Sequence, residues 1–160
     1  MIEIAIDGTA ASGKGTLGKK LSNKYNFPYL DTGILYRKVA FHIIKEQLNY
    51  TSDLEKQCCD FARNLILEEF KNENLRTEIV AELASKIATF PVLRKILNNK
   101  QKDFNKINKN KYGGCILDGR DIGTIILPNA DFKFFITASL EVRAKRRLLE
   151  KNISFLHEND

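Results

Sequence analysis

The chain opens with a strand pattern that runs directly into a glycine-framed loop and then into a helix-forming stretch. The strand pattern covers Met1–Asp7. The loop consists of Gly8, Thr9, Ala10, Ala11, Ser12, Gly13, Lys14, Gly15 and Thr16. Gly8 allows a sharp exit from the strand, and Gly13 lets backbone N–H groups close around an anion. Lys14 adds a point charge at a helix N-terminus, whose dipole also favours anions. This context predicts a phosphate-binding loop (P-loop) rather than an ordinary strand–turn–helix with a surface lysine.

Position 15 narrows the class of P-loop protein. Many such proteins use a hydroxyl directly after the lysine as a Mg²⁺ ligand. Here Gly15 takes that place and the hydroxyl comes one residue later, at Thr16. We therefore expect no direct metal ligand from the protein, with Mg²⁺ held mainly by phosphate oxygens and water. The Gly-Lys-Gly-Thr ending resembles nucleoside monophosphate kinases, and the chain has no Asn-Lys-x-Asp segment of the kind that reads guanine in GTPases.

Composition limits the size and location of the protein. With 160 residues, 43% of them hydrophobic, the chain can bury one core. It contains no long apolar run, secretory segment or Arg-rich presequence, so we expect a cytoplasmic protein that does not enter membranes. Cys58, Cys59 and Cys115 are odd in number and lack metal-ligand spacing, which predicts reduced thiols that pack rather than react.

The net charge of +6 has two interpretations. A basic surface can bind nucleic acid, and basic residues can equally serve a site that handles several phosphates. The lysines are densest between Asn98 and Lys111, without interleaved aromatic residues. This pattern favours a solvated helix face over a nucleic-acid interface.

Short strands that alternate with helices predict an α/β fold with a parallel sheet. The expected strands are Ile2–Ile6, Tyr29–Leu30, Cys115–Leu117 and Phe132–Ile136. The expected helices are Lys14–Tyr25, Gly33–Gln47, Leu54–Leu65, a helix capped by Thr77 that ends at Ala88, a long basic helix with Pro91 in its first turn, and Leu140–Lys151 after Ser139. Residues 1–49 and 76–160 form the expected core. Residues 50–75 form a shortened insertion, with a pair of extended segments near Leu65–Glu69 and Asn74–Arg76.

Two further segments place polar residues after predicted strands. In Asp31–Arg37, a hydroxyl, backbone donors and an arginine could face an anion, although Asp-Thr-Gly also serves as a helix cap. In Leu117–Thr124, Asp118 ends an apolar strand, where a carboxylate can orient the hydration shell of Mg²⁺. Arg120 has the planar fork that binds phosphate, with Asp121 as an acceptor beside it. The alternative for this segment is a tight acidic turn.

Together these motifs resemble the cytidylate kinase family, which phosphorylates CMP and dCMP. The matching segments span nearly the whole chain: Gly8–Thr16, Asp31–Arg37, Ser85 with Phe90–Arg94, Leu117–Thr124 and Ser139–Arg147. The resemblance implies ATP and Mg²⁺ as cofactors, and a three-layer P-loop kinase fold with helices on both faces of the sheet. It also implies small-molecule nucleotides as partners, and the charge pattern and the lack of a long apolar run lead us to expect neither nucleic acid nor membrane as a partner.

The resemblance also assigns roles to single residues. Lys14, Asp118 and Arg120 would be catalytic. Thr32, Arg37 and Arg120 would hold the acceptor phosphate, and Tyr36 would line the pocket. Ser85, Arg94 and Asp121 would read the cytosine edge. The chemistry agrees, because the exocyclic amine of cytosine needs an acceptor, whereas its carbonyl and ring nitrogen need donors.

Family members continue past the position of Asp160 into an arginine-rich lid, a fifth strand and a last helix. We therefore expect a sheet in the order 2-3-1-4 without the fifth strand, and self-association through the exposed edge Phe132–Ile136. Arg146 is the candidate to reach ATP in place of the lid, although a solvated helix face is an equal alternative.

The competing functions are a nucleotide-binding fragment without turnover, and another small-molecule P-loop kinase. Adenylate kinase is one such enzyme, but it reads Asp-Gly-Phe-Pro-Arg where this chain has Asp-Gly-Arg-Asp from Asp118 onward.

Overall fold

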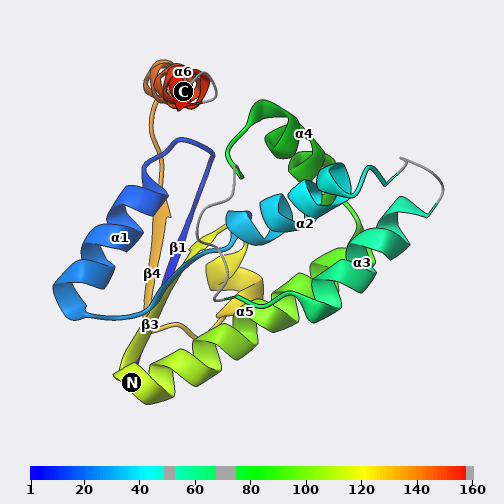
Figure 1. The fold of residues 1–160 in the computed structure, drawn as a ribbon. Helices are drawn as coiled ribbons and strands as arrows, with labels where there is room; N and C mark the ends of the chain where they lie inside the picture. Colours follow the sequence, from blue (N-terminus) through cyan, green and yellow to red (C-terminus); the bar gives the residue numbers. More distant parts are fainter. Residues whose placement is uncertain (49–52, 68–74, 158–160) are drawn as a thin grey trace. The chain divides into compact units, whose positions relative to one another are not determined.

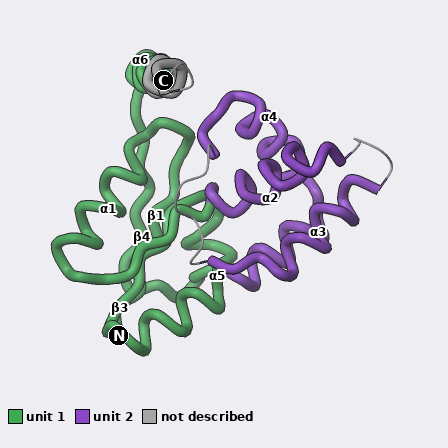
Figure 2. The backbone as a smooth tube through the Cα atoms, viewed as in Figure 1, with its two compact units in different colours: residues 1–32, 101–160 green, residues 33–100 purple. Residues whose placement is uncertain are grey.

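The structure, a computed structural model, describes residues 1–48, 53–67 and 75–157. It divides into two compact units (Figure 2). Unit 1 comprises residues 1–32 and 101–160, and unit 2 comprises residues 33–100. The expected insertion at residues 50–75 falls within unit 2, and its role as an insertion stays a prediction.

A four-stranded parallel sheet organises unit 1 (Figure 1). Its strands are β1 (Ile2–Gly8), β2 (Tyr29–Asp31), β3 (Gly114–Gly119) and β4 (Phe132–Ile136), in the order β2-β3-β1-β4. The register pairs Asp118 with Ile6 on one side and with Asp31 on the other. Because all strands run in the same direction, their carboxyl ends share one edge of the sheet, where ligands bind in folds of this kind. The predicted α/β fold and strand order 2-3-1-4 are confirmed, and within the described residues β4 is the last strand on its side.

The two faces of the sheet are covered by different elements. Ile4 and Ile6 of β1 pack with Leu17 and Leu21 of α1 (Lys14–Tyr25). Because side chains alternate along a strand, Glu3 and the other odd-numbered residues of β1 face the opposite side. There Glu3 contacts the part of α5 (Pro91–Tyr112) that belongs to unit 1. Helices therefore cover both faces, as the sequence predicts.

The segment after β3 forms a single turn of π-helix, η1 (Ile122–Ile126), a segment for which the sequence predicted no helix. The carboxylate of Asp7 explains this geometry. Its two oxygens accept hydrogen bonds from the backbone N–H groups of Ile122, at 2.7 Å, and Gly123, at 2.8 Å. Asp7 thus satisfies donors that the first turn of a helix leaves open. Asp121, just before η1, adopts a left-handed conformation with φ 59°.

Unit 2 is built from helices: α2 (Gly33–Lys45), α3 (Leu54–Asn64), α4 (Glu78–Ile87) and residues 91–100 of α5. The side-chain oxygen of Thr77 accepts from the backbone N–H of Val80, which confirms the predicted cap of α4. The imidazole of His42 stacks on Phe61 with ring centroids 3.9 Å apart. The buried apolar residues of these helices are Leu35, Val39, Ala40, Ile43, Leu54, Cys58, Cys59, Ala62, Val80, Leu83, Ala84, Ile87, Leu93 and Leu97.

The three cysteines are free and buried. Burial raises the pKa of Cys58 and of Cys115 to about 12, so both remain protonated at neutral pH. The predicted extended segments Leu65–Glu69 and Asn74–Arg76 lie partly outside the described residues. Their described parts, residues 65–67 and 75–76, form no strand.

The basic helix α5 is only partly the solvated helix that its composition suggests. Its polar residues Gln101 and Asn105 are buried, and Lys109 forms an ion pair with Glu3 at 2.7 Å. Other lysines, such as Lys102 and Lys106, remain exposed. Composition gave no sign that polar side chains of this helix would pack against the sheet.

Candidate active site

The loop between β1 and α1 has the backbone geometry that its glycines allow. Gly8 and Gly13 have positive φ angles of 152° and 104°. A Cβ atom on Gly8 would lie 2.1 Å from the carbonyl oxygen of Ile136, so no larger residue fits there without a shift of backbone. The loop is closed by a hydrogen bond from the N–H of Ser12 to the carbonyl of Thr9 at 3.3 Å. This local geometry makes a compact turn at the carboxyl edge of the sheet.

Polar groups inside the loop fit a phosphate ligand. Lys14 Nζ donates to the carbonyl oxygen of Thr9 at 3.2 Å, which holds the ammonium group against the loop. The hydroxyls of Thr9 and Ser12 are buried, and neither has a hydrogen-bond partner within the described residues. Buried hydroxyls are rarely left unpaired in native proteins. Two of them in one loop, beside a lysine, suit a ligand with several oxygen atoms.

Asp118 lies at the carboxyl end of β3 and is only 2% exposed. Burial raises its pKa to about 7, with a further contribution from the nearby Asp31 carboxylate. The hydroxyl of Tyr29 donates to Asp118 Oδ2 at 3.0 Å and opposes this rise, as does the charge of Lys14. A Cβ atom on Gly15 would lie 3.7 Å from Asp118 Oδ2. The carboxylate therefore sits beside the first turn of α1, next to the position where many P-loop proteins carry a hydroxyl.

Thr32 lies beside the backbone of Asp118. Its backbone N–H donates to the carbonyl oxygen of Asp118 at 2.9 Å. A Cβ atom on Gly119 would lie 2.1 Å from Thr32 Oγ1. Only glycine at position 119 therefore leaves room for the threonine hydroxyl in its present position. Arg120 and Asp121 follow directly and are exposed. The structure thus brings Thr32 and the Asp118–Asp121 segment together at the ends of two neighbouring strands.

Two arginines of α6 (Leu140–His157) contact the outer side of the loop. Arg143 Nε donates to the carbonyl oxygen of Ala10 at 3.0 Å. Arg146 Nη1 donates to the carbonyl oxygens of Ala11, at 3.1 Å, and Ser12, at 2.9 Å. Arg146 thus lies against the loop in this structure, and its role in contacting ATP stays a prediction.

The remaining candidate residues belong to unit 2. Arg37 of α2 donates from Nη1 to the carbonyl oxygen of Leu75 at 3.0 Å, and its neighbour Tyr36 is half-buried. Arg94 of α5 donates from Nη1 to the carbonyl oxygen of Ala88 at 3.2 Å. Ser85 lies one helical turn before Ala88 on α4. The hydroxyl of Ser85 donates to the carbonyl oxygen of Ala81 at 2.9 Å. Arg37, Ser85 and Arg94 thus stand on three different helices of unit 2, and their action in one site stays a prediction.

Sequence reasoning missed Asp7, Tyr29 and Arg143 as contributors to this site. A signal for Arg143 existed, because arginines three residues apart share a helix face with Arg146. Asp7 and Tyr29 act through partners more than 80 residues away in the chain, and nothing in their local sequence indicates those partners.

The described residues offer neither a metal-binding cluster nor a membrane-spanning helix. Residues 1–48, 53–67 and 75–157 contain no group of three or more His, Cys, Asp or Glu side chains that could hold a metal ion. In the same part of the chain, none of the helices combines the length and the apolar character that a membrane span requires.

Comparison with known proteins gives one consistent family. A sequence model described as cytidylate kinase matches residues 4–159. The chain is similar to the cytidylate kinase of Bartonella bacilliformis, with 49% identity over 147 residues, 92% of this chain and 66% of that relative. It is 46% identical to the cytidylate kinase of Bartonella quintana over 147 residues, with the same shares of the two chains. The cytidylate kinase of Methylocella silvestris is 46% identical over 149 residues, 92% of this chain and 65% of that relative. The chain thus spans just under two thirds of the length of these curated relatives.

Proposed function

The chain belongs to the cytidylate kinase family, and we propose that it transfers the γ-phosphoryl group of ATP to the phosphate of CMP or dCMP. The products are ADP and CDP or dCDP. The main support is the loop Gly8–Thr16 at the carboxyl edge of the sheet. Within the described residues it combines a lysine, Lys14, with two buried hydroxyls, of Thr9 and Ser12, that have no hydrogen-bond partner. The matches to cytidylate kinases favour this acceptor over the AMP of adenylate kinases.

On the donor side, the loop binds the phosphates of ATP. Its backbone N–H groups and Lys14 Nζ meet negative charge on the outer phosphates, and Ser12 and Thr9 offer further hydroxyls. An oxygen of the acceptor phosphate forms a bond to the γ-phosphorus as the bond to the β,γ-bridging oxygen breaks. The residues contribute by holding the two nucleotides in line and by meeting the charge that develops on the transferred group.

Mg²⁺ fits the donor side through Asp118. The carboxylate is buried beside Gly15, and burial together with the neighbouring Asp31 carboxylate raises its pKa, so a cation bound there would offset the negative charge. We propose that Asp118 holds the metal through its hydration shell, because Gly15 supplies no hydroxyl. When bound, Mg²⁺ screens the charge of the phosphates and keeps them oriented.

On the acceptor side, we propose that Thr32, Arg37 and Arg120 bind the phosphate of CMP. Arginine suits this role because its planar fork binds two phosphate oxygens at once. For the base, Asp121 accepts from the exocyclic amine of cytosine, while Ser85 and Arg94 donate to its carbonyl and ring nitrogen. Tyr36 lines the pocket. We propose Arg146, which lies on the loop, as a further contact to ATP.

This proposal places the chain in the cytoplasm, with small nucleotides as its partners. It assigns no role to nucleic acid or membranes.

Release of ADP in the presence of ATP, Mg²⁺ and each of CMP, dCMP, UMP and AMP tests the proposal. We expect the cytidine nucleotides to be preferred. Lys14→Met should abolish most of the transfer and weaken ATP binding, and should change CMP binding little. Lys20→Met is the matched control, because Lys20 is an exposed lysine on the same helix. Equal activity of the two variants would contradict the P-loop assignment. Binding of CMP and ATP without ADP release would mean that this chain binds nucleotides without turnover.

A further inference from the structure

Unit 1 contains a shallow cavity of about 440 Å³, largely open to solvent, that the proposed kinase reaction does not use. It is lined by residues of α5 and of the segment after η1: Lys102, Asn105, Lys106, Lys109, Asn110, Ile126, Leu127, Pro128 and Asn129, together with Glu3 of β1. Glu3 lies five residues before Gly8 on β1, which corresponds to about 16 Å along the strand. The cavity therefore lies toward the amino ends of the strands, away from the P-loop.

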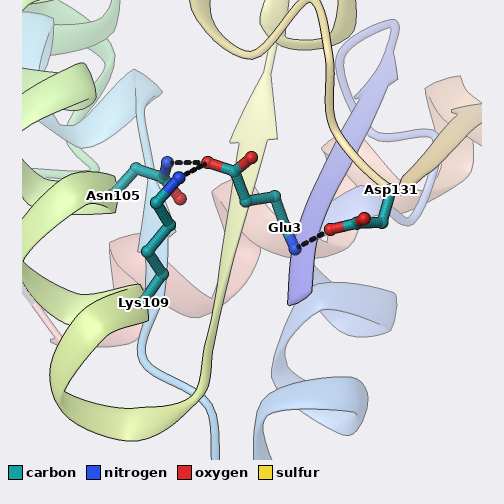
Figure 3. Close-up of polar contacts among 4 residues, drawn as sticks. All are labelled: Glu3, Asn105, Lys109 and Asp131. Carbon is teal, nitrogen blue, oxygen red and sulfur yellow. Dashed lines mark hydrogen bonds and ion pairs between the residues drawn. The ribbon is translucent and has the colours of Figure 1, made fainter. Parts of the chain in front are cut away.

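The polar groups at the base of this cavity are arranged around Glu3 (Figure 3). The Glu3 carboxylate accepts one hydrogen bond from Asn105 Nδ2 and another from Lys109 Nζ. The distance from Lys109 Nζ to Glu3 Oε1 is 2.7 Å. The backbone N–H of Glu3 donates to Asp131 at 2.8 Å, on the other side of the strand. Glu3 and Lys109 thus neutralise each other.

Asn105 has one side-chain atom without a hydrogen-bond partner in this arrangement. It is 3% exposed, and its Oδ1 atom has no hydrogen-bond partner within the described residues. The assignment of its amide atoms is fixed by chemistry, because a carboxylate only accepts hydrogen bonds and must face the nitrogen. An acceptor buried without a donor is costly, so a ligand that donates a hydrogen bond to this oxygen gains affinity.

The positive charge around the cavity indicates that the ligand carries an anionic group. Since Lys109 is paired with Glu3, the excess positive charge belongs to Lys102 and Lys106, which are exposed and lie four residues apart on one face of α5. Two ammonium groups on one rim suit a phosphate group. The volume lies within the range of small-molecule sites, about 300–1,000 Å³.

We propose that this cavity is a second binding site, for a small phosphate monoester that also carries a hydroxyl donor, as sugar phosphates do. Lys102 and Lys106 bind the phosphate, and Asn105 Oδ1 accepts from the hydroxyl. The site does not depend on the kinase reaction, because it shares no residue with the P-loop or with the proposed acceptor site.

Nuclear magnetic resonance titration with ribose 5-phosphate tests the proposal, observed at the side-chain amides of Asn105 and Asn129. These signals report on the cavity even if the probe also enters the P-loop. We expect saturable shifts, with affinity reduced about tenfold or more in Lys102→Ala/Lys106→Ala. Lys111→Ala removes the same charge from the same helix outside the cavity and should leave the affinity unchanged. Lys106→Ala alone should give a smaller loss and provides a second variant with a minimal change.

Two further probes separate the contributions to binding. Methyl phosphate lacks the hydroxyl donor and should bind about tenfold more weakly than ribose 5-phosphate, whereas free ribose should give no saturable shift. A titration with UMP tests a nucleotide as the source of the phosphate ester: saturable shifts at the same amides extend the site to nucleotides, and their absence restricts it to sugar phosphates. Absent shifts at Asn105 and Asn129 with ribose 5-phosphate, or shifts that the lysine variants do not weaken, would overturn the proposal.

Discussion

Tyr29 and Asp118 join the carboxyl ends of two neighbouring strands through one hydrogen bond, from the phenol to Oδ2 at 3.0 Å. The contact stabilises the ionised form of a carboxylate that burial otherwise drives toward its neutral form. It also places a titratable group with a pKa of about 7 beside the first turn of α1. This group has consequences for stability that can be measured without any ligand.

Stability should depend on the ionisation of Asp118. Its pKa rises from 3.8 to about 7 on folding, so the folded state favours the protonated form. The resulting stabilisation is fully present below the unfolded pKa and is lost as the pH rises through about 7, with an upper bound of about 4 kcal/mol. Asp118→Asn should therefore gain stability relative to the parent between pH 5 and pH 8, as measured by urea unfolding without Mg²⁺. The exposed Asp103→Asn should show no such trend, and a pH-independent difference for Asp118→Asn would contradict the assignment.

The Asp7 carboxylate should control the order of η1. Asp7→Asn replaces one acceptor oxygen by an N–H donor opposite the backbone N–H groups of Ile122 and Gly123, at a cost of about 1–3 kcal/mol. Hydrogen exchange at these two amides should accelerate more than exchange at the centre of β1. If the acceptor site depends on this turn, the KM for CMP should rise more than kcat falls. Unchanged exchange at Ile122 and Gly123 would show that η1 forms without the cap.

The strands and helices close to the P-loop could be predicted from sequence because their signals are local. Lys14–Tyr25 and Phe132–Ile136 have the same bounds in the structure as in the prediction. The turn η1 could not be predicted, because it depends on Asp7, whose partners lie 115 and 116 residues away. The same holds for Asn105 and Glu3, which meet only when α5 packs on the sheet. Sequence patterns thus located the phosphate loop but missed the side chains that tertiary packing adds to it.

Selection of the base should depend on Asp121. Asp121→Ala removes the proposed acceptor for the cytosine amine and should weaken CMP binding by about 1–3 kcal/mol, with little effect on UMP. Calorimetric titration of both nucleotides measures the preference. Asp103→Ala controls for the loss of an exposed carboxylate. A variant that still prefers CMP by the parent's margin would show that another residue reads the base.

The edge of the sheet should govern self-association. Within the described residues β4 is the last strand beyond β1, and Phe132, Phe134 and Phe135 are 51%, 40% and 72% exposed. A strand edge with unpaired backbone groups and exposed aromatic side chains promotes pairing with a second chain. We therefore expect this 160-residue chain to form dimers or larger species through β4 at micromolar concentrations.

Phe135→Lys tests this expectation, because a charge on an edge strand opposes pairing. Sedimentation velocity should show a larger monomer fraction for Phe135→Lys than for the parent. Ile107→Lys, which changes another exposed apolar residue on α5, should leave the distribution as it is. Hydrogen exchange provides a second measurement, because pairing of β4 in the dimer should slow exchange of its outward-facing amides as concentration rises. A monomeric parent whose β4 amides are as strongly protected as those of β1 would show that the edge is already covered within one chain.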